Sequence, residues 1–337
     1  MANKVKAFGE VMMRLHVPGN KKLEQTRALD MSFSGTGVNV LTALGKFGNQ
    51  TSLITTLPDN NIGEAALSYL QSLRVGVQDI RRDGDHIGMF FLEDGFDLRP
   101  SVVTYTNREI SAFHQAVASD YQMERILLDT DMVHFCGIGL AVSENARNTM
   151  FSIAEKAKER GILVVFDCNF RPKLWKNNIQ RARNDYQQML QLSDVCFMTE
   201  KDAIHVLGYA TDEVERKSQI QNLIPKVAEK YGIQTIAGTI REQLQDNKHE
   251  IEGFLYTNAN FYFSKRYVFR IFDRIGGGDG FASGIMHGLR QQFSKEDIIQ
   301  FAMAAGILAH TTYGDSPISS DKEVWALVSN HDPDIER

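Results

Sequence analysis

The sequence has few cysteines, and they do not fit a disulfide-bonded protein. Cys136, Cys168 and Cys196 are odd in number, lie far apart and form no CxxC pair. Small disulfide scaffolds carry an even number of closely spaced cysteines. A disulfide framework is therefore excluded, and a reducing compartment is expected.

Long hydrophobic runs are also absent. No window approaches the ~20 apolar residues of a membrane-spanning helix. The opening stretch MANKVKAFGEVMMRL has no sustained apolar segment followed by a small-residue cleavage site. We therefore expect a cytoplasmic protein with no membrane partner.

Basic residues are not in excess. The formal net charge is −5, and the 37 lysines and arginines are scattered along the chain. Nucleic-acid binding needs a basic face, so no nucleic-acid partner is expected. The composition, 43% hydrophobic and 23% charged, is that of a soluble globular protein. Neither repeats nor a Pro/Ser-rich linker divides the chain, and we expect residues 1–337 to form a single domain.

Short apolar runs alternate with longer amphipathic stretches, which is typical of βα units around a mostly parallel sheet. The predicted fold class is therefore α/β. The expected strands are Val5–Gly9, Met132–Cys136, Ile162–Asp167, Val195–Met198 and Thr235–Gly238. The expected helices are Ser143–Arg160, Gln180–Leu192, Lys217–Tyr231, Asp279–Gln292 and Lys295–Tyr313.

Two stretches interrupt this alternation. Residues at about 12–34 and 86–108 have the pattern of strands and turns without a helix between them. We expect them to form a small β-sheet lid over the C-terminal edge of the main sheet, where open α/β folds place ligands. An exposed lid edge can be covered by pairing, so a homodimer through the lid is expected.

The stretch RIGGGDGFASG, residues 274–284, joins a glycine run to an apolar helix pattern. It fits neither GxGxxG nor GxxxxGK[ST]. Glycines before a helix N-terminus let several N–H groups meet one anion, and the helix dipole favours negative charge there. Asp279, in the first turn, could accept a proton from a hydroxyl. Phosphoryl transfer from ATP needs both parts, an anion cradle and a base, but a turn with a capping aspartate explains the stretch equally well.

Two further stretches are candidate sites. In SGTGVN, Gly35 and Gly37 allow close backbone approach, and the Asn39 amide can bond a sugar hydroxyl; taken alone, a strand-to-helix turn explains it better. In DCNFRPKLW, after a predicted strand, alternate residues 167, 169 and 171 share one side if the chain stays extended. Arg171 could hold a carboxylate or phosphate there, or form only a surface salt bridge.

Taken together and in this order, the three stretches resemble the ribokinase-type (PfkB) carbohydrate kinases. The family's glycine-pair-plus-Asn motif is similar to residues 35–39, and its D-x-x-G-A-G-D motif to residues 273–279. The resemblance runs through essentially the whole chain. It implies a ribokinase-like three-layer α/β/α fold with a β-sheet lid. The complete D-x-N-x-R-x-x-L-W pattern of residues 167–175 is similar to that of 2-keto-3-deoxygluconate kinases.

The resemblance also implies roles for individual residues. Asp279 would be the catalytic base, with the N–H groups of Gly276, Gly277, Gly278 and Asp279 as the anion hole. Arg171 would bind the acid end of the sugar, helped by Tyr105 and Arg108. The residues implied to contact the sugar are Gly35, Gly37, Asn39, Phe90, Tyr105, Arg108, Arg171 and Asp273. Those implied to contact ATP are Asn169, Gly238, Thr239, Arg241, Gly276, Gly278, His310 and Gly314.

The sequence departs from the family pattern at a few positions. Arg274 stands where a small residue or proline is usual, Gly277 where alanine is usual, and Phe90 where related enzymes often have tyrosine. The Mg²⁺-associated N-x-x-E motif would fall at residues 199–202, where both defining residues differ, so no metal ligand is assigned. Mg²⁺ is still expected to arrive with ATP, because the phosphates supply most of its anchoring.

The expected function is ATP-dependent phosphorylation of a terminal hydroxyl of 2-keto-3-deoxygluconate. Fructokinase, ribokinase or another sugar-acid kinase keeps the chemistry and changes the sugar. A non-catalytic sugar or nucleotide sensor on the same fold does not need Asp279. A nicotinamide-dependent dehydrogenase would need a fingerprint near the first strand that this sequence lacks.

Overall fold

A ten-stranded mixed sheet forms the centre of the protein. The computed structural model describes residues 4–176, 178–245, 248–273 and 275–329. From one edge to the other the sheet runs β13 (Asn260–Phe263), β12 (Lys248–Thr257), β11 (Thr235–Gln243), β10 (Val195–Phe197), β9 (Leu163–Asp167), β8 (Thr130–Cys136), β1 (Lys4–Phe8), β4 (Thr51–Leu57) and β5 (Ile80–Arg82), while β14 (Tyr267–Arg270) also pairs with β12.

Seven neighbouring strands of this sheet, β11 to β5, run parallel, and β12 turns back antiparallel to β11. Strands β8, β9 and β10 end level with one another, because Cys136 pairs with Asp167 and Asp167 with Phe197. Polar residues that follow these strands therefore meet at one edge of the sheet, as the sequence pattern predicts.

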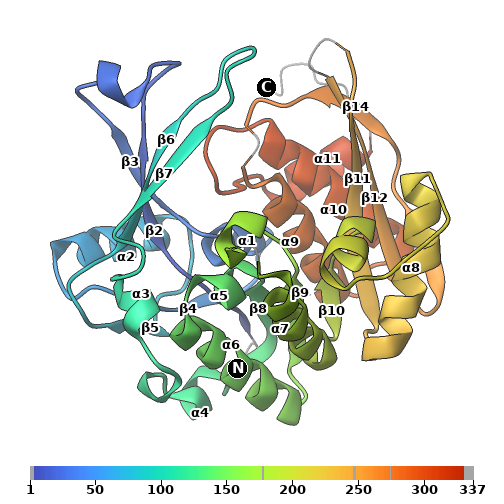
Figure 1. Ribbon diagram of the computed structural model, residues 1–337, viewed down its shortest axis with the longest axis horizontal. Coiled ribbons are helices and arrows are strands. Elements are labelled where there is room, and N and C mark those ends of the chain that lie inside the picture. The colour runs from blue at the N-terminus through green and yellow to red at the C-terminus, as the bar shows by residue number, and fades with distance from the viewer. Residues whose placement is uncertain (1–3, 177, 246–247, 274, 330–337) are drawn as a thin grey trace.

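Helices cover both faces of the sheet, which gives the three-layer α/β/α fold (Figure 1). Their buried apolar stripes pack on the strand side chains, and this packing supplies most of the helices' stability. One face carries α5 (Ile138–Val142), α6 (Glu144–Glu159), α7 (Ile179–Leu192) and α8 (Arg216–Tyr231). The other carries α1 (Thr36–Lys46), α2 (Asn61–Ser72), α9 (Gly277–Arg290), α10 (Lys295–His310) and α11 (Asp321–Val328).

Short elements complete the described chain. They are the helices α3 (Ala112–Gln115) and α4 (Met123–Ile126), the 3₁₀ turns η1 (Leu23–Gln25), η2 (Ala118–Asp120) and η3 (Pro172–Trp175), and the π-helical turn η4 (Asp202–Val206). No helix in the ranges described above is both long enough and apolar enough to span a membrane.

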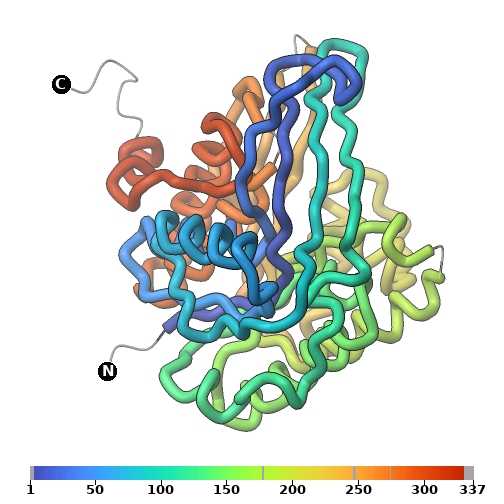
Figure 2. The backbone as a smooth tube through the Cα atoms, turned by 90° about the vertical axis from the view of Figure 1, so that its left-hand side faces the viewer, coloured from blue at the N-terminus to red at the C-terminus, as the bar shows by residue number. Residues whose placement is uncertain are grey.

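A separate four-stranded sheet rises from the main body. Its order is β3 (Asp30–Ser34), β2 (Met12–His16), β6 (Gly88–Glu93) and β7 (Val102–Thr106). Figure 2 shows these strands extending together away from the main sheet. They come from the two β-rich stretches singled out in the sequence, and we call this sheet the lid.

The predicted strands and helices agree with the structure except at their ends. Helix α9 begins at Gly277, two residues before the predicted start, because Gly276 adopts a left-handed conformation (φ 84°) that turns the chain into the helix. Helix α10 ends at His310 rather than Tyr313. The predicted fold class, ribokinase-like α/β with a small separate sheet, is confirmed.

Candidate active site

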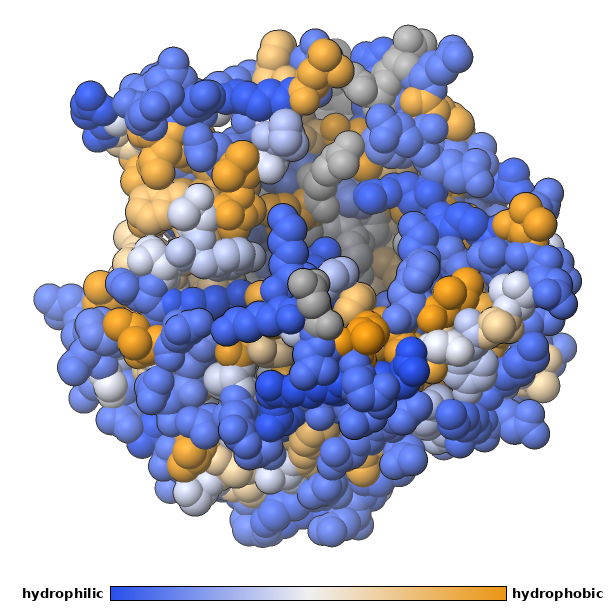
Figure 3. Space-filling model, in the orientation of Figure 1, coloured by the Kyte–Doolittle hydropathy of each residue, from blue (hydrophilic) through white to orange (hydrophobic). Residues whose placement is uncertain are grey.

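A cavity of about 980 Å³ lies between the lid and the C-terminal edge of the main sheet. Figure 3 shows the hollow, with the lid on its left. All three motif regions contribute to its wall, although they are separated by more than a hundred residues in sequence. Of the predicted site residues, the wall contains Gly35, Gly37, Asn39, Phe90, Tyr105, Arg108, Asn169, Arg171, Gly238, Thr239, Gly276, Gly278 and Asp279.

Asp279 lies in the first turn of α9, on the cavity wall. Asn39 donates from Nδ2 to Asp279 Oδ2 at 2.7 Å, across 240 residues of sequence. Ser316 in turn donates to Asn39 Oδ1 at 3.1 Å, which fixes the orientation of the amide. One carboxylate oxygen is thereby held in place, and Oδ1 remains to accept a proton.

Burial raises the pKa of Asp279 to about 7, and the negative charge of Asp315 adds to this, although Asn39 and Arg171 lower it. Burial likewise raises the pKa of Asp167 to about 8, helped by the charges of Asp279 and Asp202. A carboxylate with a pKa near 7 is poised to accept a proton at neutral pH.

The glycines ahead of Asp279 shape the start of α9. The first N–H groups of a helix have no partner within it, and Gly278 and Asp279, two of the first residues of α9, line the cavity. Gly278 is exposed, with open space where a Cβ would stand. Gly277 is buried against His310, because a Cβ on Gly277 would overlap the His310 ring. The terminus therefore has the features of an anion site, with the His310 ring packed behind Gly277.

The SGTGVN stretch forms the turn from β3 into α1. A Cβ on Gly35 would overlap the carbonyl oxygen of Glu10, so this position requires glycine. Gly37 packs closely on Ala7 and Leu53 of the main sheet. The two glycines bring α1 against the sheet and place Asn39 beside Asp279.

The DCNFRPKLW stretch follows β9. The prediction that residues 167, 169 and 171 share one side assumed an extended chain, and this premise is wrong, because Asn169 has a positive φ of 37°. All three residues still line the cavity. Asn169 donates to Cys136 Sγ at 3.4 Å, and Trp175 is buried. Arg171 is exposed, and within the described residues it has no ion-pair partner.

The lid strands contribute Met12, Ser34, Phe90, Val103 and Tyr105 to the cavity wall. Phe90 is buried and Tyr105 is 51% exposed, with their ring centroids 6.1 Å apart. Arg108 follows β7 and lies over the Tyr105 ring, 5.0 Å from its centroid. The sequence did not single out Glu10, which lines the cavity and pairs with Arg108. Its position directly after β1 was the signal that could have revealed it.

The described cavity wall does not include five of the predicted site residues, namely Asp273, Gly277, Arg241, His310 and Gly314. Asp273 instead braces the loop before α9, since its carboxylate accepts from the N–H groups of Ile275 (3.0 Å) and Gly314 (3.4 Å). His310 Nδ1 lies 2.8 Å from the Asp273 carbonyl oxygen. Arg274 of the same motif lies outside the described residues.

The N-x-x-E position, residues 199–202, holds acidic residues in a different order. Glu200 is buried and pairs with Arg216 at 2.6 Å. Asp202 lines the cavity, and its carboxylate accepts from the Thr199 N–H at 2.8 Å. No group of three or more His, Cys, Asp or Glu in the described chain could hold a metal by itself. One or two carboxylates suffice for Mg²⁺ that arrives on phosphates, and Asp167 and Asp202 fit that need.

Comparison with known proteins identifies the family. The model of the pfkB family carbohydrate kinases matches residues 2–236. The chain belongs to this family. It is accordingly a carbohydrate kinase, an enzyme that transfers a phosphoryl group to an alcohol.

Three relatives are similar over nearly their full lengths. A structure of a proposed 2-keto-3-deoxygluconate kinase from Enterococcus faecalis is 39% identical, with a TM-score of 0.95, covering 100% of this chain and 99% of that one. The 2-dehydro-3-deoxygluconokinase of Thermotoga maritima is 32% identical, with a TM-score of 0.91 over 97% and 99%. The 2-dehydro-3-deoxygalactonokinase of Haloferax volcanii is 27% identical over 100% of both chains.

A more distant structure shares the fold and contains nucleotide. It is a proposed ribokinase II from E. coli in complex with ATP and Mg²⁺, 18% identical, with a TM-score of 0.80 over 98% of this chain and 100% of that one. The family fold therefore accommodates ATP and Mg²⁺.

Proposed function

We propose that this kinase phosphorylates the terminal hydroxyl of 2-keto-3-deoxygluconate, the compound also called 2-dehydro-3-deoxygluconate. One observation carries the choice of an acid over a neutral sugar. Arg171 reaches the cavity that contains Asp279, and it has no ion-pair partner among the described residues. An unpaired guanidinium in a substrate cavity is suited to a carboxylate. The structures at 39% and 32% identity carry the names of 2-keto-3-deoxygluconate kinases, which supports the same substrate class.

In the proposed reaction, Asp279 accepts the proton of the sugar hydroxyl. Asn39 holds one carboxylate oxygen of Asp279, so the other is directed at the substrate. With a pKa of about 7 in the free protein, Asp279 is partly ionised at neutral pH. Its proton affinity also makes it a stronger base than an exposed aspartate.

The N-terminus of α9 stabilises the transferring phosphoryl group. Its free N–H groups and helix dipole meet the charge that develops on the phosphoryl oxygens. When bound, Mg²⁺ neutralises phosphate charge. Asp167 and Asp202 are the carboxylates that would face it. Gly238 and Thr239, at the end of β11, are proposed to lie along the nucleotide.

The lid and Arg171 are proposed to bind the sugar acid. Arg171 holds the carboxylate, Tyr105 and Arg108 add contacts from the lid, and Gly35 with Asn39 contacts the hydroxyls. Closure over the substrate excludes water from the phosphoryl group. Another sugar acid, such as the substrate named for the Haloferax relative, differs only in the groups that meet these residues.

A homodimer through the lid is proposed from the exposure of β7. This strand is an edge of the lid sheet, and Val102 and Val103 are 45% and 41% exposed. Pairing along this edge would cover both. Light scattering during size-exclusion chromatography tests the proposal, and a monomer at micromolar concentration would contradict it.

An ADP-release assay over a panel of sugars and sugar acids tests the proposed function. The panel includes 2-keto-3-deoxygluconate, its galacto epimer, fructose and ribose. The proposal expects the highest kcat/KM with a 2-keto-3-deoxy sugar acid. A clear preference for fructose or ribose would overturn it, whereas the family assignment would stand.

A further inference from the structure

Glu10 places a negative charge on the wall of a cavity that we propose to bind an acid. It follows β1 at the C-terminal edge of the main sheet, and its side chain is only 7% exposed. Burial would raise the pKa of Glu10, but its contacts with His114 and Arg108 outweigh burial and lower the pKa. A buried carboxylate that repels the substrate needs a compensating purpose.

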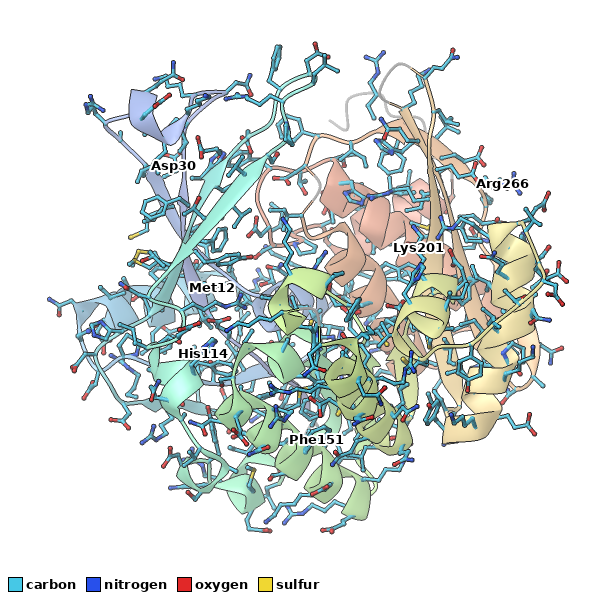
Figure 4. The ribbon with its side chains drawn as sticks, in the orientation of Figure 1. Met12, Asp30, His114, Phe151, Lys201 and Arg266 are labelled. Carbon is cyan, nitrogen blue, oxygen red and sulfur yellow. The ribbon has the colours of Figure 1, made fainter. Side chains whose placement is uncertain are left out.

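The contacts of Glu10 indicate that purpose. Arg108 donates from Nε to Glu10 Oε2 at 2.9 Å, and its Nη2 lies 2.8 Å from the same oxygen. On the other side, Nε2 of His114 lies 3.2 Å from Glu10 Oε1. Figure 4 labels His114 in α3 at the foot of the lid. Glu10 therefore joins the main sheet to the chain segment that leaves β7.

The backbone around Glu10 leaves it little freedom. A Cβ on Gly88 of β6 would lie 3.0 Å from Glu10 Oε1, and one on Gly35 would overlap the Glu10 carbonyl oxygen. Both neighbours are glycines, which allow this close approach. Glu10 is therefore held in place, and it anchors the Arg108 guanidinium.

Arg108 and Arg171 differ in how their charges are balanced. Glu10 neutralises Arg108, whereas Arg171 has no ion-pair partner in the described part of the chain. Among the same residues, the Arg108 guanidinium contacts Glu10 and the Tyr105 ring, and these contacts leave Nη1 for a ligand. A guanidinium fixed at Nε and Nη2 loses less side-chain entropy when Nη1 binds substrate.

We propose that Glu10 is a positioning residue that holds the Arg108 guanidinium on the cavity wall, so that Nη1 donates to the substrate. Arg171 then supplies the net positive charge for the acid, and the Glu10–Arg108 pair supplies an oriented donor. The identity of the substrate in this inference rests on the proposed function. The coupling between Glu10 and Arg108 does not, because it follows from their contacts.

A double-mutant cycle of Glu10→Gln and Arg108→Ala tests the proposal. Each single variant should raise the KM of the sugar about tenfold, with kcat and the KM for ATP changed less than about twofold. In the Arg108→Ala background, Glu10→Gln should not raise the KM further, because Glu10 acts through Arg108. Glu93→Gln makes the same substitution in the lid and is the matched control, which should leave KM unchanged. The Glu93 side chain accepts from the Leu23 N–H, its one hydrogen bond within the ranges that the structure describes.

Two results would overturn the proposal. One is a wild-type KM in Glu10→Gln. The other is a double variant whose increase in KM is the product of the two single-variant increases, as expected of a general structural defect. Thermal unfolding checks that each variant folds. If Glu10→Gln fails to fold, Glu10→Asp keeps the charge on a shorter side chain and carries the same cycle.

The cycle uses whichever acceptor the wild-type enzyme phosphorylates in the panel assay. A preference for a neutral sugar would therefore sink the proposed substrate and still leave the coupling measurable. Independent effects of the two substitutions on the KM of the true acceptor would overturn the coupling and leave the substrate assignment intact.

Discussion

The proposed reacting groups lie on the main body of the protein, whereas the lid faces them with a more exposed side chain, Tyr105. Asp279 lies in the first turn of α9 and is held by Asn39, which Ser316 holds in turn. Across the cavity, Tyr105 of the lid is 51% exposed and meets mainly Phe90 and Arg108. In the proposed reaction, the contacts that hold Asp279 are already present in the body, whereas the lid gains its contacts from substrate. Changes in the body should therefore lower kcat, and changes on the lid should alter KM.

The largest effect is expected from Asp279→Asn. Asn keeps the shape but cannot accept the proton, so kcat should fall about 10³-fold or more, while ATP binding changes little. Steady-state kinetics and ATP titration by calorimetry measure the two quantities. Turnover close to wild type would contradict the role of Asp279 as the base. The control is Asp59→Asn, which changes an exposed aspartate and should behave as wild type.

The pH dependence should expose the same carboxyl group. Because the pKa of Asp279 is raised to about 7 in the folded protein, kcat/KM for the sugar at saturating ATP should fall about tenfold per pH unit below that value. Flat kcat/KM down to pH ~5 would contradict this assignment.

Stability gives an independent view of this pKa. The folded-state pKa lies above the ordinary value of 3.8, so the folded protein binds the proton more tightly than the unfolded chain. The ionised carboxyl therefore costs stability progressively as pH rises from about 4 to about 7. Asp279→Asn should unfold at a higher temperature than wild type at pH 8, and the difference should shrink towards pH 4.

A moderate effect is expected at Gly277, where the family motif usually has alanine. Here the His310 ring fills the space of a Cβ, so Gly277→Ala should shift the start of α9 and reduce kcat about tenfold. His310→Ala in the same chain should restore part of the loss by freeing that space. Steady-state kinetics of Gly277→Ala and of the double variant with His310→Ala test this prediction. A wild-type kcat in Gly277→Ala would show that the start of α9 tolerates displacement of the His310 ring.

The smallest effect is expected on the lid. Phe90→Tyr adds a hydroxyl to the cavity wall at a position where related enzymes often have tyrosine. It should lower the KM of the sugar acid by about fivefold at most, with kcat unchanged, since one added hydrogen bond contributes about 1 kcal/mol or less net. A marked loss of kcat would mean that the lid also positions the reacting groups.

Much of this architecture could be predicted from local sequence. Apolar runs and amphipathic stretches indicated the parallel sheet, and the two β-rich stretches indicated the lid. Since the C-terminal ends of parallel strands meet at one edge, DCNFRPKLW could be placed at the site from the pattern alone. The resemblance to the PfkB kinases added SGTGVN and the glycine run to it. The start of α9 was predicted two residues late, because the left-handed Gly276 extends the helix towards the glycines.

Contacts between distant segments could not be predicted. The Glu10–Arg108 pair joins residues 98 apart. The close contact between His310 and Gly277 depends on how α9 packs against α10. Asn169 departs from the extended conformation that simple alternation assumed. In each case tertiary packing, rather than local preference, determines where the side chain lies.

The central claim is that Arg171 selects an acid for the base Asp279. Its most direct test is kcat/KM for 2-keto-3-deoxygluconate and for a neutral sugar in wild type and Arg171→Ala. The control is Arg181→Ala, an arginine that pairs with Asp185 on α7. The account predicts a loss of about tenfold or more for the acid and little change for the neutral sugar. Equal losses for both substrates would contradict it.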